Sequence, residues 1–456
     1  MADRPKPMIS VAGIRGTLGG TLLPGEFLKF ASAFFSTLDN KAIVLGTDTR
    51  PSRPLMRHIV EAAAMAAGCK ILDIGIVPTP TVGFMTKHLE AGGGVAITAS
   101  HNPVNWNALK FFSSEGTFLN QEQIDEVLRR YKEENFEYVT VEKLGKIEDV
   151  VLPFHPHIRA VLRALDLRPI RRRKYKVAID LCNGAGIDPL PELLTRLGCK
   201  TFSIFDDPKR AFEREPEPLP ENLEALCSAV VETRSDIGFA VDPDADRLAL
   251  VDETGRAIGE ERTLTLAARY VLQVHQAQHD QLPPLVANLS TTRALDDVAE
   301  EFGTHVERTK IGEANVVQRI IESGALIGGE GNGGVIFPAV HAGRDAATGI
   351  ALILGAMAVA GKPLSELNGE VPDYAMVKRK VGIEGKEVSA LLEKLKAAFS
   401  DAKGFDEQDG LKILYADRWV HVRPSGTEPI LRVFAEAPSD GEADKLAKKA
   451  MEIVEQ

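Results

Sequence analysis

The sequence is poor in cysteine and has no long apolar segment. Its four cysteines in 456 residues form no Cys-x-x-Cys pair, which argues against a disulfide framework or a structural zinc site and favours a reducing compartment. The longest apolar run, residues 350–360, is too short to span a bilayer and is expected to be a core helix. Because the N-terminus also lacks an apolar signal region, we expect a cytoplasmic protein.

An excess of positive charge is also absent. The formal net charge is −11, from 54 basic and 65 acidic residues, so neither a nucleic acid nor a membrane surface is expected as a partner. The basic run Arg171–Lys174 is interpreted as solvated surface on this acidic chain. A site for a phosphorylated ligand therefore needs positive charge of its own. What the chain does have is length, and 456 residues predict three or four domains.

The first three quarters of the chain repeat one pattern of predicted elements. A strand, a loop and a helix lead to a second strand, and after a second helix a third strand ends in a loop. The strand–loop–helix segments begin at Ala42, Val177 and Leu285. The closing loops span residues 98–103, 242–247 and 329–334. We expect three related α/β units, each presenting a loop at the same end of a parallel sheet.

The last part of the chain has a different pattern. After Pro372, predicted strands follow one another closely at residues 411–415, 419–423 and 430–436, which indicates an antiparallel sheet and an α+β domain. The polar stretch 133–149 is expected to lead out of the first unit. The four predicted domains are residues 1–150, 151–252, 253–370 and 371–456.

Ser100 lies in the loop Thr98–Pro103, which follows an apolar strand predicted at residues 92–97. Pro103 keeps the residue before it out of helical geometry, and ligands of open α/β sheets bind at the carboxyl ends of strands. The pair Ser100–His101 alone is what a surface turn also contains. Three further loops favour a functional interpretation.

Three carboxylates, Asp242, Asp244 and Asp246, alternate in the loop after the strand predicted at residues 237–241. Carboxylates at alternate positions of a turn can converge on one cation, and a set of oxygen ligands favours Mg²⁺ or Ca²⁺. An acidic surface loop is the alternative. The loop directly follows an apolar strand, and this favours the metal site.

The two remaining loops suit a sugar phosphate. Residues 423–429 supply a guanidinium, two hydroxyls and backbone amides next to glycine, which are the groups that cradle a phosphate; a simple hairpin turn is the alternative. The glycine-rich loop 329–334 carries Glu330 and Asn332, which can hydrogen-bond a polyhydroxyl ligand, although a structural turn fits equally well. Together the four loops indicate phosphoryl transfer to and from Ser100 on a sugar phosphate.

With these four loops in this order over essentially the whole chain, the sequence resembles the α-D-phosphohexomutase family. The resemblance implies an α/β fold of four domains around a central cleft. Three are related α/β units with mixed, mostly parallel sheets, and the C-terminal domain is α+β. It also implies Mg²⁺ as cofactor, a small phosphosugar as substrate and a bisphosphorylated sugar as activator, in a monomer or a homodimer.

The same resemblance assigns roles to individual residues. Ser100 is the implied phosphoserine, which binds Mg²⁺ together with the three aspartates, and Lys110 is the implied proton-handling residue. The implied catalytic residues are Ser100, Lys110, Arg15 and His101. The implied substrate-binding residues are Arg247, Glu330, Asn332, Arg423, Ser425, Gly426, Thr427 and Arg432.

Two loops depart from the family's usual pattern. Pro243 and Ala245 stand where the acidic loop more often has glycine, but the carboxylates are kept. Gly334 stands where the family more often has a histidine assigned to acid/base work, and His341 is a nearby candidate to replace it. The Gly-Asn-Gly-Gly form of the glycine-rich loop, with Trp106–Lys110 after the serine loop, is most similar to the phosphoglucosamine mutase branch.

The hypothesis from the sequence is a phosphosugar mutase that interconverts hexose 6-phosphate and hexose 1-phosphate, with glucosamine as the first choice of sugar. A phosphomannomutase, phosphoglucomutase or phosphopentomutase of the same family is the alternative. A sugar-phosphate sensor without catalysis comes from a different class. Such a sensor has no use for a phosphorylatable Ser100.

Overall fold

The computed structural model describes residues 7–10, 13–383, 386–425 and 430–455. The chain divides into two compact units. Unit 1 comprises Met1–Thr263 and Asn332–Leu367, and unit 2 comprises Leu264–Gly331 and Asn368–Gln456. Among the described residues, no helix combines the length and the apolar character that crossing a bilayer requires.

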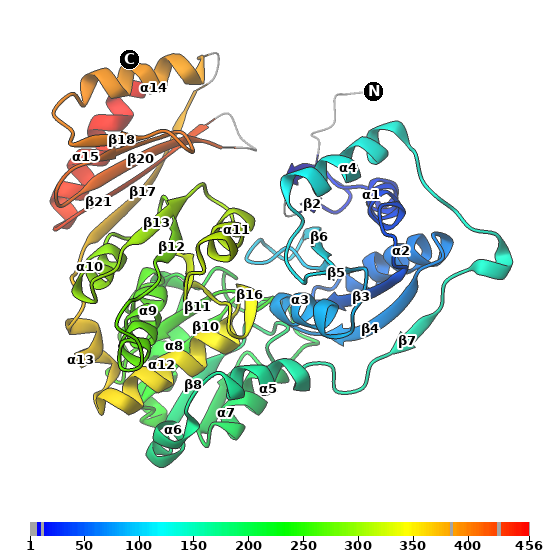
Figure 1. Cartoon of the computed structure of the whole chain (residues 1–456), viewed down its shortest axis with the longest axis horizontal. Helices are drawn as coiled ribbons and strands as arrows, with labels where there is room; N and C mark the ends of the chain where they lie inside the picture. The colour runs from blue at the N-terminus through cyan, green and yellow to red at the C-terminus, as the bar shows by residue number, and fades with distance from the viewer. Residues whose placement is uncertain (1–6, 11–12, 384–385, 426–429, 456) are drawn as a thin grey trace. The chain divides into compact units, whose positions relative to one another are not determined.

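Unit 1 contains a seven-stranded mixed sheet in the order β1-β2-β6-β5-β3-β4-β7 (Figure 1). Its strands are β1 (Met8–Ser10), β2 (Gly13–Thr17), β3 (Ala42–Thr47), β4 (Lys70–Ile76), β5 (Gly93–Ile97), β6 (Trp106–Ser113) and β7 (Ile147–Asp149). The strands β4, β3 and β5 are parallel, as expected, so their carboxyl ends share one edge. The strand β6 returns antiparallel to β5 and places Lys110 opposite Ala96. This return brings Lys110 back toward the serine loop.

Phenylalanines of α1 form the centre of the core beside this sheet. The helices of this part are α1 (Pro24–Ser36), α2 (Arg53–Ala66), α3 (Thr79–His88) and α4 (Gln121–Glu133), and the 3₁₀ turn η1 is Val141–Lys143. The side chains of Phe27, Phe30 and Phe34 are almost fully buried. The helix α1 packs against α2 and α4, whereas α3 packs against β3 and β5.

Two features of this part are not evident from the sequence pattern. Ser52 stands at the N-cap of α2, but its hydroxyl does not cap the helix and donates instead to Asn107 Oδ1 (2.6 Å). The polar stretch 133–149 ends in β7, which pairs in parallel with β4. All three residues of β7 are exposed, so no apolar pattern marks it as a strand.

The second sheet of unit 1 has the order β11-β10-β8-β9. Its strands are β8 (Lys176–Asp180), β9 (Lys200–Ile204), β10 (Ile237–Val241) and β11 (Leu248–Val251). The helices around it are α5 (His155–Arg163), α6 (Leu167–Arg173), α7 (Pro189–Arg196) and α8 (Glu224–Thr233), and the 3₁₀ turn η2 is Pro220–Asn222. Every residue of β10 is buried. It runs parallel to β8 and is followed by the antiparallel β11, so the acidic loop is the turn between β10 and β11.

The segment that returns to unit 1 forms the hairpin β15 (Gly334–Phe337) and β16 (His341–Arg344), followed by α12 (Ala346–Ala360). The helix α12 contains the longest apolar run and packs against α5, α6 and β11. Most of its residues are buried, which confirms the predicted core helix. Asp345 caps it by accepting from the backbone N–H groups of Ala347 and Thr348.

Unit 2 contains the parallel strands β12 (Leu285–Asn288), β13 (Val306–Thr309) and β14 (Gly328–Glu330) with α10 (Ala294–Glu301) and α11 (Glu313–Ser323). It also contains an antiparallel sheet in the order β17-β21-β20-β19-β18, on which α14 and α15 pack (Figure 1). These elements are β17 (Ala375–Gly382), α14 (Val388–Ala398), β18 (Gly404–Asp406), β19 (Leu411–Leu414), β20 (Trp419–Pro424), β21 (Ile430–Ala437) and α15 (Asp440–Glu455). The helices α9 (Glu261–Gln276) and α13 (Leu364–Gly369) contain unit boundaries. The α+β fold of the last part is confirmed.

Candidate active site

Ser100 occupies a strained position just beyond β5. Its φ of +49° lies in the left-handed region, which non-glycine residues adopt rarely and often at functional sites. The Ser100 amide donates to Thr98 Oγ1 (3.1 Å), and the residue is 8% exposed. Ser100 Oγ donates to Asp242 Oδ2 at 2.8 Å. The serine loop and the acidic loop, which sequence analysis treats separately, therefore meet directly.

Arg50 fixes the backbone of the serine loop. Its guanidinium donates to the backbone carbonyls of Ser100 (2.7 Å), Asn102 (2.8 Å) and Pro103 (2.5 Å). Its Nε donates to Asp48 Oδ2 (3.0 Å), and both side chains are 2% exposed. One buried cation thus fixes three carbonyls of the loop, a role that its sequence context does not reveal.

The three aspartates of the acidic loop converge. One carboxylate oxygen from each lies within 4.8 Å of the others, and all three residues are buried. Asp242 Oδ1 accepts from the backbone N–H groups of Asp246 and Arg247 (3.2 Å each). Ala245 adopts a φ of +50° within the loop. The alternation of carboxylates in the sequence becomes one compact cluster, as expected for a cation site.

Asp244 and Asp246 each have one oxygen in hydrogen bonds and one without. Asp244 Oδ2 accepts from Lys110 Nζ (2.6 Å) and Thr79 Oγ1 (2.5 Å). Asp246 Oδ2 accepts from Lys110 Nζ (3.3 Å) and Arg344 Nη2 (2.7 Å). The Oδ1 atoms of both residues are buried and, within the described part of the chain, have no hydrogen-bond partner. Buried carboxylate oxygens left open in this way fit a bound divalent cation.

The local charges divide these groups by proton affinity. Burial raises the pKa of Asp242 well above its ordinary value, and the neighbouring Asp246 and Asp244 carboxylates raise it further. Burial also acts to raise the pKa of Asp246, but Arg344 and Lys110 outweigh it and hold that pKa below its ordinary value. Burial acts to lower the pKa of Lys110, and its ion pairs with Asp244 and Asp246 reverse this and raise it. Lys110 is therefore held as a fixed positive charge in this arrangement.

His101 and two arginines lie close to Ser100. His101 Nδ1 is 3.5 Å from Ser100 Oγ. Burial lowers the pKa of His101 well below its ordinary value, and the charges of Arg247 and Arg15 add to this effect. The imidazole beside Ser100 is therefore held in its neutral form. Arg247 Nη1 donates to Glu217 Oε1 (2.8 Å), a residue of the proline-rich loop before α8.

His341 does not join this group. Its ring centroid lies 6.5 Å from those of Phe84 and of His157, and burial lowers the pKa of His341 to about 3. Among the described residues, no hydrogen bond or ion pair connects His341 to Ser100 or to the acidic loop. The expectation that it takes the place of the family's loop histidine is not supported.

Unit 2 carries other predicted ligand-binding residues. Glu330 is 4% exposed, and its Oε1 accepts from Asn288 Nδ2 (2.8 Å) and the Gly312 amide (3.2 Å). Asn332, two residues later, belongs to unit 1, and its Oδ1 is buried without a hydrogen-bond partner among the described residues. Ser425 donates its amide to the Ile430 carbonyl (2.9 Å). Gly426 and Thr427 lie outside the described residues.

Arg423 and Arg432 stand opposite each other on β20 and β21. The Nε atoms of both are buried and lack a hydrogen-bond partner among the residues described in this unit. Burial lowers the pKa of Arg423, and the charge of Arg432 lowers it further, while Asp409 opposes both effects. Two cations held side by side with open donors are suited to an anion such as a phosphate.

A buried histidine in unit 2 makes its stability depend on pH. His421 Nε2 donates to the Asp409 carbonyl (2.6 Å), so Nδ1 accepts from Ser290 Oγ (2.8 Å). Burial lowers the pKa of His421 to about 4, against about 6.5 in the unfolded chain. Because the folded state then binds fewer protons, the free energy of unfolding decreases as the pH falls from 6.5 to 4.

We expect this histidine to contribute a loss of about 2 to 3 kcal/mol between pH 7.5 and 4.5. Urea unfolding of the protein and of His421→Gln at both pH values measures it. The variant is expected to lose less stability than the parent on acidification. An equal loss in both proteins contradicts the prediction.

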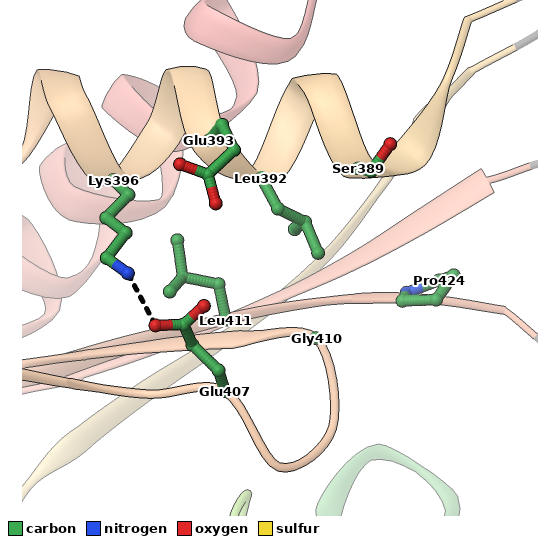
Figure 2. Close-up of a pocket in the computed structure, with 8 residues that line it drawn as sticks. All are labelled: Ser389, Leu392, Glu393, Lys396, Glu407, Gly410, Leu411 and Pro424. Carbon is green, nitrogen blue, oxygen red and sulfur yellow. Dashed lines mark hydrogen bonds and ion pairs between the residues drawn. The ribbon is translucent and has the colours of Figure 1, made fainter.

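A pocket of about 330 Å³ lies between α14 and the β18–β19 turn of unit 2 (Figure 2). Its charged lining is dominated by the ion pair of Lys396 Nζ with Glu407 Oε1 (2.5 Å), and Glu393 lies beside it. Its lysine is already paired with a carboxylate, and none of the predicted site residues lines the pocket. We therefore do not assign the substrate to it.

Three residues of the site are not indicated by the sequence: Arg50, Thr79 and Arg344. Thr79 begins α3. Its hydroxyl donates to the Asp244 carboxylate, and its backbone amide donates to the Asp244 carbonyl (2.9 Å). Arg344 ends β16 and reaches Asp246. The only signal in the sequence is an arginine between Gly343 and an α12-capping aspartate, which does not by itself indicate a partner about 100 residues away.

Comparison with known proteins defines the class to which this chain belongs. Three domain families described as phosphoglucomutase/phosphomannomutase alpha/beta/alpha domains I, II and III match residues 8–138, 155–255 and 260–374. The C-terminal domain family of the same proteins matches residues 366–453. A phosphoglucomutase/phosphomannomutase of Thermococcus kodakarensis is 37% identical over 454 residues, with 97% of each chain covered. The chain belongs to the phosphoglucomutase/phosphomannomutase family.

Two further similarities refine this assignment. A probable phosphoglucosamine mutase of Methanopyrus kandleri is 35% identical, over 97% of this chain and 96% of that relative. The crystal structure of a phosphoglucomutase/phosphomannomutase family protein from Burkholderia thailandensis matches with a TM-score of 0.84 at 27% identity, over 98% of both chains. The resemblance to the α-D-phosphohexomutases and to their phosphoglucosamine mutase branch is confirmed.

Proposed function

We propose that this protein is a Mg²⁺-dependent phosphosugar mutase that interconverts hexose 6-phosphate and hexose 1-phosphate, with glucosamine as the sugar. Its class is that of the isomerases that act as intramolecular phosphotransferases. The observation that carries the proposal is the contact of Ser100 Oγ with Asp242 Oδ2 (2.8 Å), inside a buried cluster of three aspartates. A hydroxyl held beside a cation site is the arrangement that phosphoryl transfer through serine needs.

The proposed reaction has two transfers. Phosphorylated Ser100 gives its phosphoryl group to the free hydroxyl of the sugar phosphate, so the bond from phosphorus to Ser100 Oγ breaks as the bond to the sugar oxygen forms. The bisphosphorylated sugar then reorients within the site, so that its other phosphoryl group faces Ser100. Its other phosphoryl group then passes to Ser100 Oγ, which regenerates the phosphoserine and releases the isomeric monophosphate.

In this proposal, residues of the chain itself transfer the proton and supply positive charge beside the transferring group. In the first transfer the sugar hydroxyl loses a proton and Ser100 Oγ gains one, and His101, whose Nδ1 is 3.5 Å from Ser100 Oγ, carries the proton between them. Lys110, fully paired with the aspartates, remains a cation beside the transferring group. Arg247 and Arg15 add positive charge next to His101. When bound by Ser100 and the three aspartates, Mg²⁺ supplies the charge that stabilises the transferring phosphoryl group.

The remaining loops bind the rest of the substrate. We assign the sugar hydroxyls to Glu330 and Asn332. The non-transferring phosphate is assigned to the loop with Arg423, Ser425, Gly426 and Thr427, and to Arg432. The open Nε donors of the two arginines support the phosphate site. The four predicted domains, the cytoplasmic location and the choice between monomer and homodimer stay predictions.

A panel of substrates tests the choice of sugar. The 1-phosphates of glucosamine, glucose, mannose and a pentose are compared with the same enzyme, and the highest kcat/KM is expected for glucosamine 1-phosphate. The support for glucosamine is the Methanopyrus relative, whereas the Thermococcus relative favours glucose or mannose. A higher kcat/KM for glucose or mannose 1-phosphate contradicts the choice of glucosamine and supports the alternative, a phosphoglucomutase or phosphomannomutase.

Removal of the metal is expected to abolish turnover. After dialysis against a chelator, the three aspartates repel one another, and no hydrogen-bond donor from the described part of the chain reaches the Oδ1 atoms of Asp244 and Asp246. We expect activity to fall by at least about 100-fold and to return with added Mg²⁺. A coupled assay with and without Mg²⁺ measures this, with Asp246→Asn as the variant that Mg²⁺ should not restore. Full activity in the chelator contradicts a metal-dependent reaction.

A further inference from the structure

Gly334 and Arg344 share one small volume inside unit 1. A Cβ atom at residue 334 would lie 2.3 Å from Cδ and 3.0 Å from Cγ of Arg344. Both distances are well below ordinary contacts between carbon atoms, which are about 3.5 to 4.0 Å. The φ of Gly334 is outside the left-handed region, in contrast to that of Gly333 (+85°). Glycine is needed at position 334 for space and not for backbone conformation.

The Arg344 side chain has little freedom to move out of this volume. The two nearest atoms that a Cβ would touch belong to the middle of the Arg344 side chain, and the third is Asn332 Oδ1 (3.1 Å). The far end of Arg344 is fixed because Nη2 donates to Asp246 Oδ2 (2.7 Å). The residue is only 9% exposed. A side chain at position 334 therefore pushes on a stem that is held at both ends.

The backbone that carries Arg344 is fixed as well. The next residue, Asp345, caps α12 and accepts from His157 Nε2 (3.1 Å) in the state where that nitrogen is protonated. The residue after it, Ala346, donates its amide to the carbonyl of Ala245 in the acidic loop (3.3 Å). Residues 344–346 thus contact the acidic loop through both a side chain and the backbone.

Arg344 makes the shorter of the two hydrogen bonds to Asp246. The other donor, Lys110, is 3.3 Å from Asp246 Oδ2 but 2.6 Å from Asp244, so it belongs mainly to Asp244. Without Arg344, the Asp246 carboxylate keeps the long hydrogen bond from Lys110 and a 3.9 Å ion-pair contact of Oδ1 with Arg247 Nε, and can rotate. With Arg344, Oδ2 is occupied, and Oδ1 is left as the oxygen without a hydrogen-bond partner among the described residues.

We propose that Arg344 is a positioning residue for the cation site, which orients Asp246 so that its Oδ1 is available as a ligand, and that Gly334 is required to admit its side chain. The inference rests on the proposed metal-dependent function. It also explains what occupies the space at position 334, where the family more often has a histidine assigned to acid/base work. Arginine stays protonated in proteins, so the group in this volume supplies geometry and charge and takes no part in proton transfer.

The test is direct binding of Mn²⁺ to the metal-free full-length protein, followed by the electron paramagnetic resonance signal of the free ion. We expect the dissociation constant for Mn²⁺ to rise about tenfold in Arg344→Met and about threefold in Arg344→Lys, which keeps the charge but loses the fork. Gly334→Ala is expected to match Arg344→Met. The double variant is expected to bind no more weakly than either single one, because both changes disrupt the same contact.

The matched control is Arg57→Met. Arg57 is also paired with carboxylates, those of Glu61 and Asp73, but has no contact with the acidic loop among the described residues. Its Mn²⁺ affinity is expected to be that of the parent protein. Thermal unfolding of every variant shows which are folded, and Arg344→Lys and Gly334→Ala carry the test if Arg344→Met is not.

A positive side chain next to a cation site can also weaken metal binding by repulsion. If this is all that Arg344 does, Arg344→Met binds Mn²⁺ more tightly than the parent protein. A dissociation constant that falls or stays unchanged in folded Arg344 and Gly334 variants therefore overturns the proposal. The titration uses no sugar, so a failure of the mutase function in the substrate panel is a separate result.

Discussion

Replacing Ser100 with alanine is expected to reduce mutase turnover by at least about 1,000-fold, because the phosphoenzyme route requires an oxygen nucleophile at this position. Intact-mass measurement of the parent protein should show a fraction heavier by one phosphate. Ser100→Ala should lack this fraction. A coupled assay with the preferred 1-phosphate gives the turnover.

The same variant is expected to be as stable as the parent. Alanine at position 100 takes the same left-handed backbone (φ +49°) with the same strain. The lost hydroxyl makes one short side-chain hydrogen bond, to Asp242 (2.8 Å), and one long contact, with His101 Nδ1 (3.5 Å). Ser113→Ala, at the end of β6, is a control that should keep activity. Near-normal turnover of every phosphosugar by folded Ser100→Ala contradicts the mechanism.

Replacing Arg50 with alanine is expected to give the largest loss of stability. Arg50 and Asp48 are both 2% exposed and form an ion pair, and removal of one partner leaves the other charge buried without compensation. The carbonyls of Ser100, Asn102 and Pro103 also lose their donor. We expect the free energy of unfolding to fall by about 3 to 5 kcal/mol, measured by urea denaturation.

A double-mutant cycle separates the two parts of this effect. Asp48→Ala with Arg50→Ala removes both charges, so the double variant should be less destabilised than the sum of the two single variants. Arg50→Lys keeps the charge but cannot reach three carbonyls and an acid at once. It should recover only part of the stability. A loss below about 1 kcal/mol in Arg50→Ala shows that the loop does not depend on this residue.

The fold was predictable where apolar runs end in distinctive loops. The strand β10 spans Ile237–Val241, as the sequence predicts, because every residue in it is buried and Asp242 ends the apolar run. The resemblance implies mixed sheets, but the positions of the antiparallel return strands could not be predicted from the apolar pattern. Buried positions on β6 include Asn107 and Lys110, and these polar residues obscure the apolar pattern that marks a strand.

The site was predictable in its residue types but not in its connections. Ser100, Lys110 and the three aspartates are brought together as the resemblance implies. Thr79, Arg50 and Arg344 were missed because each acts through a partner that sequence spacing cannot reveal. The sequence shows that Gly334 replaces the family's more usual histidine, but only the structure shows that the Arg344 side chain fills the space beside it.

The connections of the acidic loop have a consequence for how this protein folds. Its partners lie far away in the sequence: Asp242 meets a residue 142 positions away, Asp244 has partners 134 and 165 positions away, and Asp246 has one 98 positions away. Contacts of such range form only after long stretches of chain have closed, which makes them slow to appear. We therefore expect helices and sheets to form before the site does. During refolding, the three acids of this loop can become buried only when cations from distant parts of unit 1 are in place to compensate them.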